Sequence, residues 1–277
     1  MKSTARGTRR GLAAALAASA VVVGLFAAVP QANAGQDGDE ADRTTNHTMG
    51  SQIREHEGGD TRSGDVADPG VQATMSGIDV ASYQGNVDWK AHWNAGKRFA
   101  YVKATEGLTY KNPYFSQQYT GSYNVGMIRG AYHFALPNVS SGAQQANYFA
   151  SSGGGWSRDG KTLPGVADLE YNPYGATCYG LSQASMAAWI RDFANTYRAR
   201  TGRDAVFYTS TSWWSQCVGS AQAFAGTNPL WVARYSSSVG TLPYNWGVWT
   251  FWQYTSSPLD TNYFNGAIDR LQAMANG

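Results

Sequence analysis

The amino-acid sequence predicts an α/β protein in which eight mainly parallel strands close into a β/α barrel with fewer than eight helices. Short apolar runs recur along the chain with helix-like or loop segments between them, and this alternation is typical of parallel sheets. Polar residues follow several of the runs, as they do at the carboxyl ends of barrel strands. An open doubly wound sheet is the alternative, but no Gly-rich phosphate loop follows the first run.

The expected strands are short apolar runs separated by segments long enough for crossover connections. They cover residues 77–81, 99–104, 127–134, 165–169, 205–209, 230–235 and 248–254, with an eighth near 259–261. The clearest helix covers residues 182 to about 200, because Ser182 can cap it, Gly202 can end it, and its apolar residues share one face. Weaker helical patterns cover residues 113–125 and 140–151.

The first 34 residues have the pattern of a secretory signal peptide. A positively charged start precedes an apolar run from residue 12 to about 29, and small residues Ala32 and Ala34 follow. We expect cleavage after Ala34 and a secreted, extracellular protein without a membrane partner after cleavage. The alternative is an uncleaved membrane anchor.

Residues 35–70 contain almost no large apolar side chains, so we expect a disordered linker or a pro-segment there. His47 and His56 lie in this segment and are therefore poor catalytic candidates. Residues 71–277 hold every Trp, Tyr and Cys and form the expected catalytic barrel domain. From Met75 on, 14 Lys and Arg face 10 Asp and Glu, a mild excess that suits an anionic polymer such as a cell wall. No basic run or motif indicates a nucleic-acid partner.

Two cysteines, Cys178 and Cys217, lie in the part of the chain expected to be exported. Disulfides form and persist outside the cell, so we expect a bridge, with two free thiols as the alternative. Closing a loop of this length would contribute about 4 kcal/mol of stability.

Two carboxylates end the apolar run "GVADLE", Asp168 and Glu170. Side chains two residues apart in a strand point to the same face, so the pair would share one environment. A glycosidase needs one protonated carboxyl as acid and a second, ionised carboxylate, and mutual repulsion raises one pKa of such a pair. Asp79 and Asp260 stand at other strand ends and complete the catalytic candidates. The alternative is a pair that simply ends in solvent.

Other polar and aromatic side chains at strand ends are candidates for binding substrate. They are Lys103, Glu106, Tyr132, Tyr208, Tyr235, Trp252 and Gln253. Lys103 and Glu106 are also expected to form a structural ion pair at the barrel rim. At least one of Trp213, Trp214 and Trp252 is a candidate for stacking on a sugar ring. His133 is expected to be a hydrogen-bonded core residue. No zinc motif and no G-x-S-x-G elbow is present, so we expect neither metal nor cofactor.

Six motifs resemble, in the same order along the chain, those of a known family. They are "GIDVASYQG", "FAYVKATEG", "GMIRGAYHF", "GVADLEYNP", "FYTS" and "FWQYTSSPLDTN". Together they resemble the Ch-type lysozymes, glycoside hydrolase family 25, and the secreted bacterial members of the cellosyl kind most. The resemblance spans residues 77 to 271. It implies a TIM barrel that lacks some helices, with a groove at the strand carboxyl ends. It also implies hydrolysis of the β-1,4 bond between N-acetylmuramic acid and N-acetylglucosamine in peptidoglycan.

The resemblance assigns roles to the four acids. Glu170 is implied as general acid, and Asp168 as a group that orients the substrate's acetamido group or stabilises the transition state. Asp79 and Asp260 are implied to tune the site. Leu169 stands where the family usually has Ile, and the short stretch before Asp260 contains Pro258, which weakens the alignment there.

Several alternatives remain open at this point. The mechanism can be retaining, inverting or assisted by the substrate's acetamido group, with retention or assistance favoured. A non-catalytic wall-binding barrel and a glycosidase acting on chitin-like substrates are the competing functions. The expected partner is the peptidoglycan glycan strand, and the expected oligomeric state is a monomer.

Overall fold

The computed structural model describes residues 47–58 and 73–277. All the described residues belong to one compact unit. The predicted signal peptide and its cleavage site lie outside the described residues. Within the described ranges, no helix is both long and apolar enough to cross a membrane.

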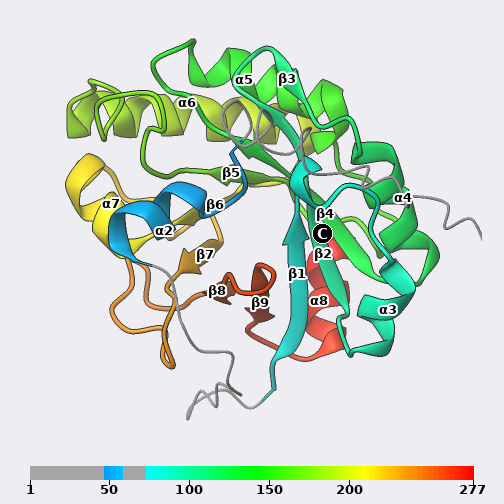
Figure 1. Cartoon of the computed structure of the whole chain (residues 1–277). Coiled ribbons are helices and arrows are strands. Elements are labelled where there is room, and N and C mark those ends of the chain that lie inside the picture. The colour runs from blue at the N-terminus through cyan, green and yellow to red at the C-terminus, as the bar shows by residue number, and fades with distance from the viewer. Residues whose placement is uncertain (1–46, 59–72) are drawn as a thin grey trace, which may run out of the picture. The chain divides into compact units, whose positions relative to one another are not determined.

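Eight strands form a closed ring, as the sequence predicts. Their order is β1, β2, β4, β5, β6, β7, β8 and β9, and β1 pairs with both β2 and β9 to close the ring (Figure 1). The strands are β1 (Met75–Val80), β2 (Phe99–Glu106), β4 (Ile128–Phe134), β5 (Val166–Asp168), β6 (Val206–Thr209), β7 (Leu230–Ala233), β8 (Phe251–Thr255) and β9 (Thr261–Phe264).

The ring is mixed rather than wholly parallel. The strand β9 runs antiparallel to both of its neighbours, while the other pairs in the ring are parallel. A two-residue strand, β3 (Tyr110–Lys111), folds back antiparallel on β2 and was not predicted. The expectation of eight mainly parallel strands is confirmed.

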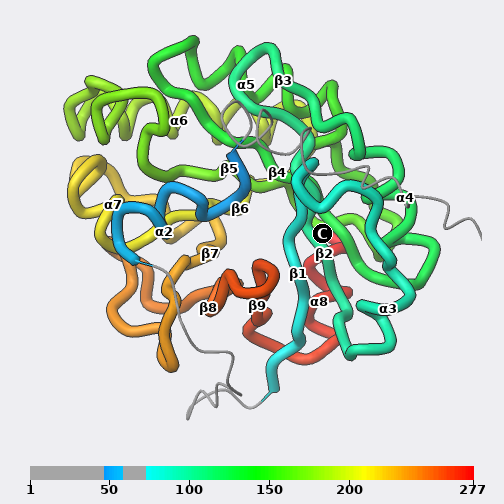
Figure 2. Tube along the Cα trace, in the orientation of Figure 1, coloured from blue at the N-terminus to red at the C-terminus, as the bar shows by residue number. Residues whose placement is uncertain are grey.

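Helices fill only some of the connections between strands. In residues 73–277 the α-helices are α3 (Trp89–Asn94), α4 (Phe115–Asn124), α5 (Gly142–Phe149), α6 (Gln183–Thr201), α7 (Thr211–Cys217) and α8 (Ile268–Asn276). The connections from β7 to β8 and from β8 to β9, which Figure 2 traces, contain no α-helix. The prediction of fewer than eight helices is therefore confirmed for the barrel.

Helix α6 follows the predicted boundaries because its end signals are local. The Ser182 side chain accepts a hydrogen bond from the Ser185 amide, and Gly202 ends the helix in the left-handed conformation at φ 75°. The two weaker patterns also form helices, α4 and α5, each slightly shorter than expected.

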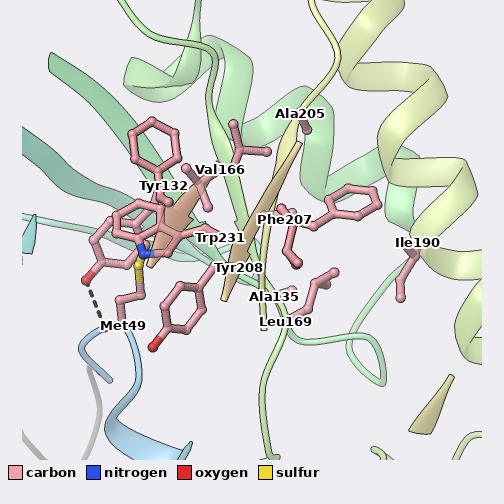
Figure 3. Close-up of a cluster of buried hydrophobic side chains, with 14 of the residues drawn as sticks. Met49, Tyr132, Ala135, Val166, Leu169, Ile190, Ala205, Phe207, Tyr208 and Trp231 are labelled. Carbon is pink, nitrogen blue, oxygen red and sulfur yellow. Dashed lines mark hydrogen bonds between the residues drawn. The ribbon is translucent and has the colours of Figure 1, made fainter. Parts of the chain in front are cut away.

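Aromatic side chains fill the barrel. The ring of Tyr101 packs 4.9 Å from that of Trp231, and Trp231 packs 5.3 Å from Phe251. Gly130 makes room for this packing, because a Cβ there would lie 2.2 Å from a ring carbon of Tyr101. Figure 3 shows the adjoining part of the core, where the Met49 side chain lies among Tyr132, Tyr208 and Trp231.

Met49 belongs to a segment in which the sequence did not predict a helix. Residues 47–58 contain the helix α2 (Ser51–Glu57), so the expected disorder is wrong for these residues, while the alternative of a pro-segment stays a prediction. Disorder was expected because the segment is poor in apolar residues. Two of the few it has, Met49 and Ile53, are buried against the barrel core, and this contact orders the helix.

The predicted disulfide is present. Cys178 and Cys217 are bonded, with a sequence separation of 39 and a Cα–Cα distance of 5.3 Å. The bridge ties the end of α7 to the loop that precedes α6.

Candidate active site

The four predicted catalytic carboxylates meet at one end of the barrel. Asp79 lies in β1, Asp168 ends β5, and Glu170 follows two residues later. Asp260 precedes β9, and because β9 is antiparallel to its neighbours, its start lies at the rim where the parallel strands end. All four are buried, with exposed fractions of 1%, 0%, 1% and 5% in the order named.

Asp168 and Glu170 sit in an environment that disfavours two charges. Burial raises the pKa of Asp168 well above its usual range, and the neighbouring Glu170 charge raises it further. The one hydrogen-bond partner that the described residues offer the Asp168 carboxyl is Glu170, and this bond also raises the pKa of Asp168. Burial also raises the pKa of Glu170, to about 7, so this carboxyl holds a proton up to neutral pH.

Glu170 accepts three backbone hydrogen bonds from the segment that precedes the barrel. Its Oε1 accepts from the Gly50 amide at 2.7 Å, and its Oε2 accepts from the amides of Gln52 and Ile53 at 2.8 and 2.9 Å. These amides lie at the start of α2, where helix N–H groups have no partner within the helix. Each of these bonds favours the ionised carboxylate and limits the rise in the Glu170 pKa.

Asp79 is held by two side-chain amides. Its Oδ2 accepts from Gln253 Nε2 at 3.0 Å and from Asn262 Nδ2 at 2.7 Å. Burial raises the pKa of Asp79 to about 6 in spite of these bonds. Asn262 was not among the predicted site residues, although it ends the motif "LDTN" that contains Asp260.

Asp260 forms an ion pair with Arg54 of α2. The distance from Arg54 Nη1 to Asp260 Oδ1 is 3.0 Å. Burial and the neighbouring Asp79 charge nevertheless raise the pKa of Asp260 well above its usual range. Asp79 and Asp260 are adjacent in space, since the Asp79 amide donates to the Asp260 carbonyl at 3.3 Å.

Gln253 connects two predicted binding residues to the carboxylates. Its Oε1 accepts from the hydroxyls of Tyr208 at 2.5 Å and Tyr235 at 2.8 Å, while its amide nitrogen donates to Asp79. The hydroxyl of Tyr132 accepts from the Met49 amide at 3.1 Å, the dashed line in Figure 3. The structure thus brings these four predicted residues to the rim that holds the acids.

Lys103 and Glu106 form the predicted ion pair at the end of β2, with a Nζ–Oε2 distance of 2.6 Å and both side chains buried. Burial alone would raise the pKa of Glu106, but the Lys103 charge and hydrogen bonds from His47, Lys103 and Tyr174 lower it to about 2. Tyr174, whose hydroxyl donates to Glu106 at 2.8 Å, was not predicted.

The tryptophan prediction is not supported. Trp213, Trp214 and Trp252 are all fully buried, so none presents a face for a sugar ring in this structure. Trp252 follows the alternation of β8: its neighbour Gln253 reaches Asp79, so the indole points to the opposite side. There its N–H donates to the Arg234 carbonyl at 2.8 Å.

His133 is a core residue, as predicted. Its two ring nitrogens lie 2.8 Å from Thr105 Oγ1 and 2.9 Å from Gln145 Oε1, and burial lowers its pKa to about 4. Within residues 47–58 and 73–277, no cluster of His, Cys, Asp and Glu side chains is arranged to hold a metal ion.

The sequence of this chain is similar to those of known proteins. The sequence model of the family described as Glycosyl hydrolases family 25 matches residues 78–262. Lysozyme M1 of Streptomyces globisporus is 53% identical over 216 residues, which cover 75% of this chain and 74% of that one. The N,O-diacetylmuramidase of Chalaropsis sp is 48% identical over 211 residues, 74% of this chain and all of that one.

Solved structures of proteins with similar sequences have the same fold. The bacterial lysozyme from Streptomyces coelicolor superposes with a TM-score of 0.71 at 53% identity and covers 74% of this chain and 98% of its own. A family GH25 lysozyme from Aspergillus fumigatus gives a TM-score of 0.73 at 46% identity, over 74% of this chain and all of its own. With its ring of strands and its rim of carboxylates, this chain belongs to glycosyl hydrolase family 25.

Proposed function

We propose that this chain is a secreted muramidase that hydrolyses the β-1,4 bond between N-acetylmuramic acid and N-acetylglucosamine in peptidoglycan, with Glu170 as general acid. The supporting observation is a buried carboxyl pair at the strand ends in which the pKa of Glu170 is raised to about 7. A carboxyl that keeps its proton near neutral pH can protonate the leaving glycosidic oxygen.

Asp168 would act on the same sugar from the same strand face. As the proton of Glu170 moves to the glycosidic oxygen, the bond from that oxygen to C1 breaks and positive charge develops at the ring. Asp168 would stabilise this charge, or orient the 2-acetamido group so that its oxygen attacks C1. Water then attacks C1 from the face that the leaving group has left, and it gives its proton to the Glu170 carboxylate. Attack from that face gives net retention on both routes, which we propose over inversion.

The remaining polar residues would orient the glycan and the two catalytic carboxyls. Asp79 and Asp260 lie beside the pair, and Gln253 with Tyr208 and Tyr235 forms a hydrogen-bonded network next to Asp79. These groups would bind sugar hydroxyl or amide groups when a glycan is present.

The test is a long digestion of purified peptidoglycan with the whole chain, followed by borohydride reduction and mass spectrometry of the fragments. We expect new reduced ends on muramic acid. Glu170→Gln should abolish the release of fragments, while Glu55→Gln, which changes an exposed glutamate of helix α2, should not. Reduced ends on glucosamine would refute the bond specificity, and bound glycan without fragments would indicate a wall-binding barrel.

Two finer points belong to the same proposal. Two relatives are named N,O-diacetylmuramidase, so digestion should be compared on peptidoglycan with and without O-acetyl groups. Secretion is supported by the signal-like residues 1–34 and by the disulfide, and we propose that the secreted protein is a monomer. N-terminal sequencing and light scattering of the protein from culture medium would test both parts.

A further inference from the structure

We propose that residues 47–58 are an inhibitory segment, which occupies the substrate site at the rim of carboxylates and slows hydrolysis until the segment leaves. This inference rests on the proposed function, because this rim is the site assigned to peptidoglycan. It concerns how the activity of that site is regulated.

The inhibitory segment engages the general acid itself. Both carboxylate oxygens of Glu170 accept backbone N–H groups, one from Gly50 and two from Gln52 and Ile53. A glycosidic oxygen needs a proton from one of those two oxygens, so the substrate and the segment compete for the same positions. The N–H donors also favour an ionised carboxylate, whereas a general acid must carry a proton.

The segment is anchored by apolar burial as well as by hydrogen bonds. Met49 is completely buried and Ile53 is 1% exposed, both within the main hydrophobic cluster of the barrel. Figure 3 shows Met49 among Tyr132 and Tyr208, two of the side chains predicted to bind substrate. A segment held only at the surface would not displace a glycan from these residues.

The segment also holds the other polar groups of the groove. Arg54 pairs with Asp260, and the Tyr235 hydroxyl oxygen lies 3.2 Å from the Gly50 carbonyl oxygen. At its far end, Glu57 accepts from the Tyr171 hydroxyl at 2.9 Å. Two of the four catalytic candidates, Glu170 and Asp260, thus contact the segment directly. Asp79 lies beside Asp260, and Asp168 lies beside Glu170.

The charge of the segment favours this docking. Residues 47–58 contain two Glu and one Arg, whereas the chain from Met75 on has 14 Lys and Arg and 10 Asp and Glu. An acidic segment and a mildly basic barrel attract each other, an effect that salt weakens.

Gly50 offers a sharp way to release the segment. It adopts φ +77°, and a Cβ there would lie 2.3 Å from the hydroxyls of Tyr208 and Tyr235 and 2.6 Å from Gln253 Oε1. The variant Gly50→Ala therefore cannot keep the contact, and we expect the barrel to keep its fold because all of its buried core residues except Met49 and Ile53 follow residue 75. Gly58→Ala is the matched control: it has φ +86° and nothing within 4 Å of the added Cβ.

The experiment compares the whole chain with these two variants and with Arg54→Ala, which removes the ion pair to Asp260. Two readouts are needed: the initial rate of release of soluble fragments from peptidoglycan, and the affinity for a soluble peptidoglycan tetrasaccharide measured by calorimetry. We expect Gly50→Ala to cleave about tenfold faster than the whole chain and to bind the tetrasaccharide about tenfold more tightly. Arg54→Ala should change both in the same direction, and Gly58→Ala should match the whole chain.

The outcomes separate the two proposals. Equal rates and equal affinities for the whole chain, Gly50→Ala and Arg54→Ala would overturn inhibition while leaving the hydrolase. Tight binding by the released variants without cleavage would uphold occlusion of the groove and overturn the hydrolase. Thermal unfolding of each variant checks that its barrel is intact, and Arg54→Ala carries the test if Gly50→Ala unfolds. A synthetic peptide of residues 47–58 should inhibit Gly50→Ala, and a scrambled peptide should not.

Discussion

The buried pair of Lys103 and Glu106 allows a quantitative prediction. The pKa of Glu106 falls from an ordinary value of 4.5 to about 2 in the folded chain. That difference corresponds to about 3 kcal/mol of stability. Because the folded-state pKa is depressed, the contribution is fully present above pH 4.5 and is lost as the pH falls through 2. Glu106 is only 3% exposed, so solvent screens the pair little.

The perturbation is Lys103→Met, which keeps the length of the side chain and removes its charge. The Lys103 amine lies 5.0 Å from the ring centre of Tyr110 and 5.2 Å from that of Phe134, so the apolar replacement would pack beside these rings while the buried Glu106 carboxylate loses its cation. We expect a loss of about 3 to 5 kcal/mol at pH 7. Between pH 4.5 and 2, the variant should lose less further stability than the original chain does.

Urea unfolding followed by tryptophan fluorescence at pH 7, 4.5 and 3 measures both effects. Lys90→Met removes an exposed lysine and should change stability by about 0.5 kcal/mol or less. The double variant Lys103→Met with Glu106→Leu should be more stable than Lys103→Met alone, because no unpaired charge remains buried. A loss below about 1 kcal/mol for Lys103→Met, or an unchanged pH dependence, would refute the reasoning.

Two further predictions concern the barrel scaffold. Replacing Cys178 and Cys217 together by serine should lower the free energy of unfolding by about 4 kcal/mol, as measured by denaturant titration, since the bridge closes a loop with a sequence separation of 39; a loss near zero would contradict it. Gly130→Ala should lower the melting temperature and cost about 1 to 3 kcal/mol, because the new Cβ would meet the Tyr101 ring at 2.2 Å. Gly226→Ala, with nothing within 4 Å of its added Cβ, is the control and should melt like the original chain.

The barrel could be predicted because its signals are local. Each strand is a short apolar run bounded by polar residues, and helix α6 carries its own cap at Ser182 and its own end at Gly202. The gathering of Asp79, Asp168 and Glu170 followed from one rule, that the carboxyl ends of parallel strands meet at one rim. That rule does not predict that β9 runs antiparallel to its neighbours.

The placement of the tryptophans could not be derived in the same way. Trp214 lies on a short helix, and its ring packs edge-on against Trp246 at 4.9 Å. A sequence pattern shows that such a residue is amphipathic, but it does not show whether a distant loop covers it. At least one of Trp213, Trp214 and Trp252 was therefore expected to stack on a sugar ring, although the fold buries all three.

The helix α2 was missed because its stabilising contacts are almost all distant in sequence. Met49 and Ile53 are four residues apart, the spacing of one helical face, and this was the one signal available. The helix has no side-chain cap of its own, and Glu170 fills that role from more than a hundred residues away. An average over residues 35–70 hides so short a pattern.

The same contact also explains how the folded chain accommodates its acids. Burial raises the pKa values of Asp79, Asp168, Glu170 and Asp260, so each ionises at a higher pH than an exposed carboxyl does. The segment supplies N–H donors to Glu170 and the positive charge of Arg54 to Asp260, two groups that an ionised carboxylate needs. A glycan would offer neutral hydroxyl and amide groups instead. The groove therefore favours the segment when its carboxylates are ionised, and exchange for substrate is easiest when Glu170 holds the proton that catalysis requires.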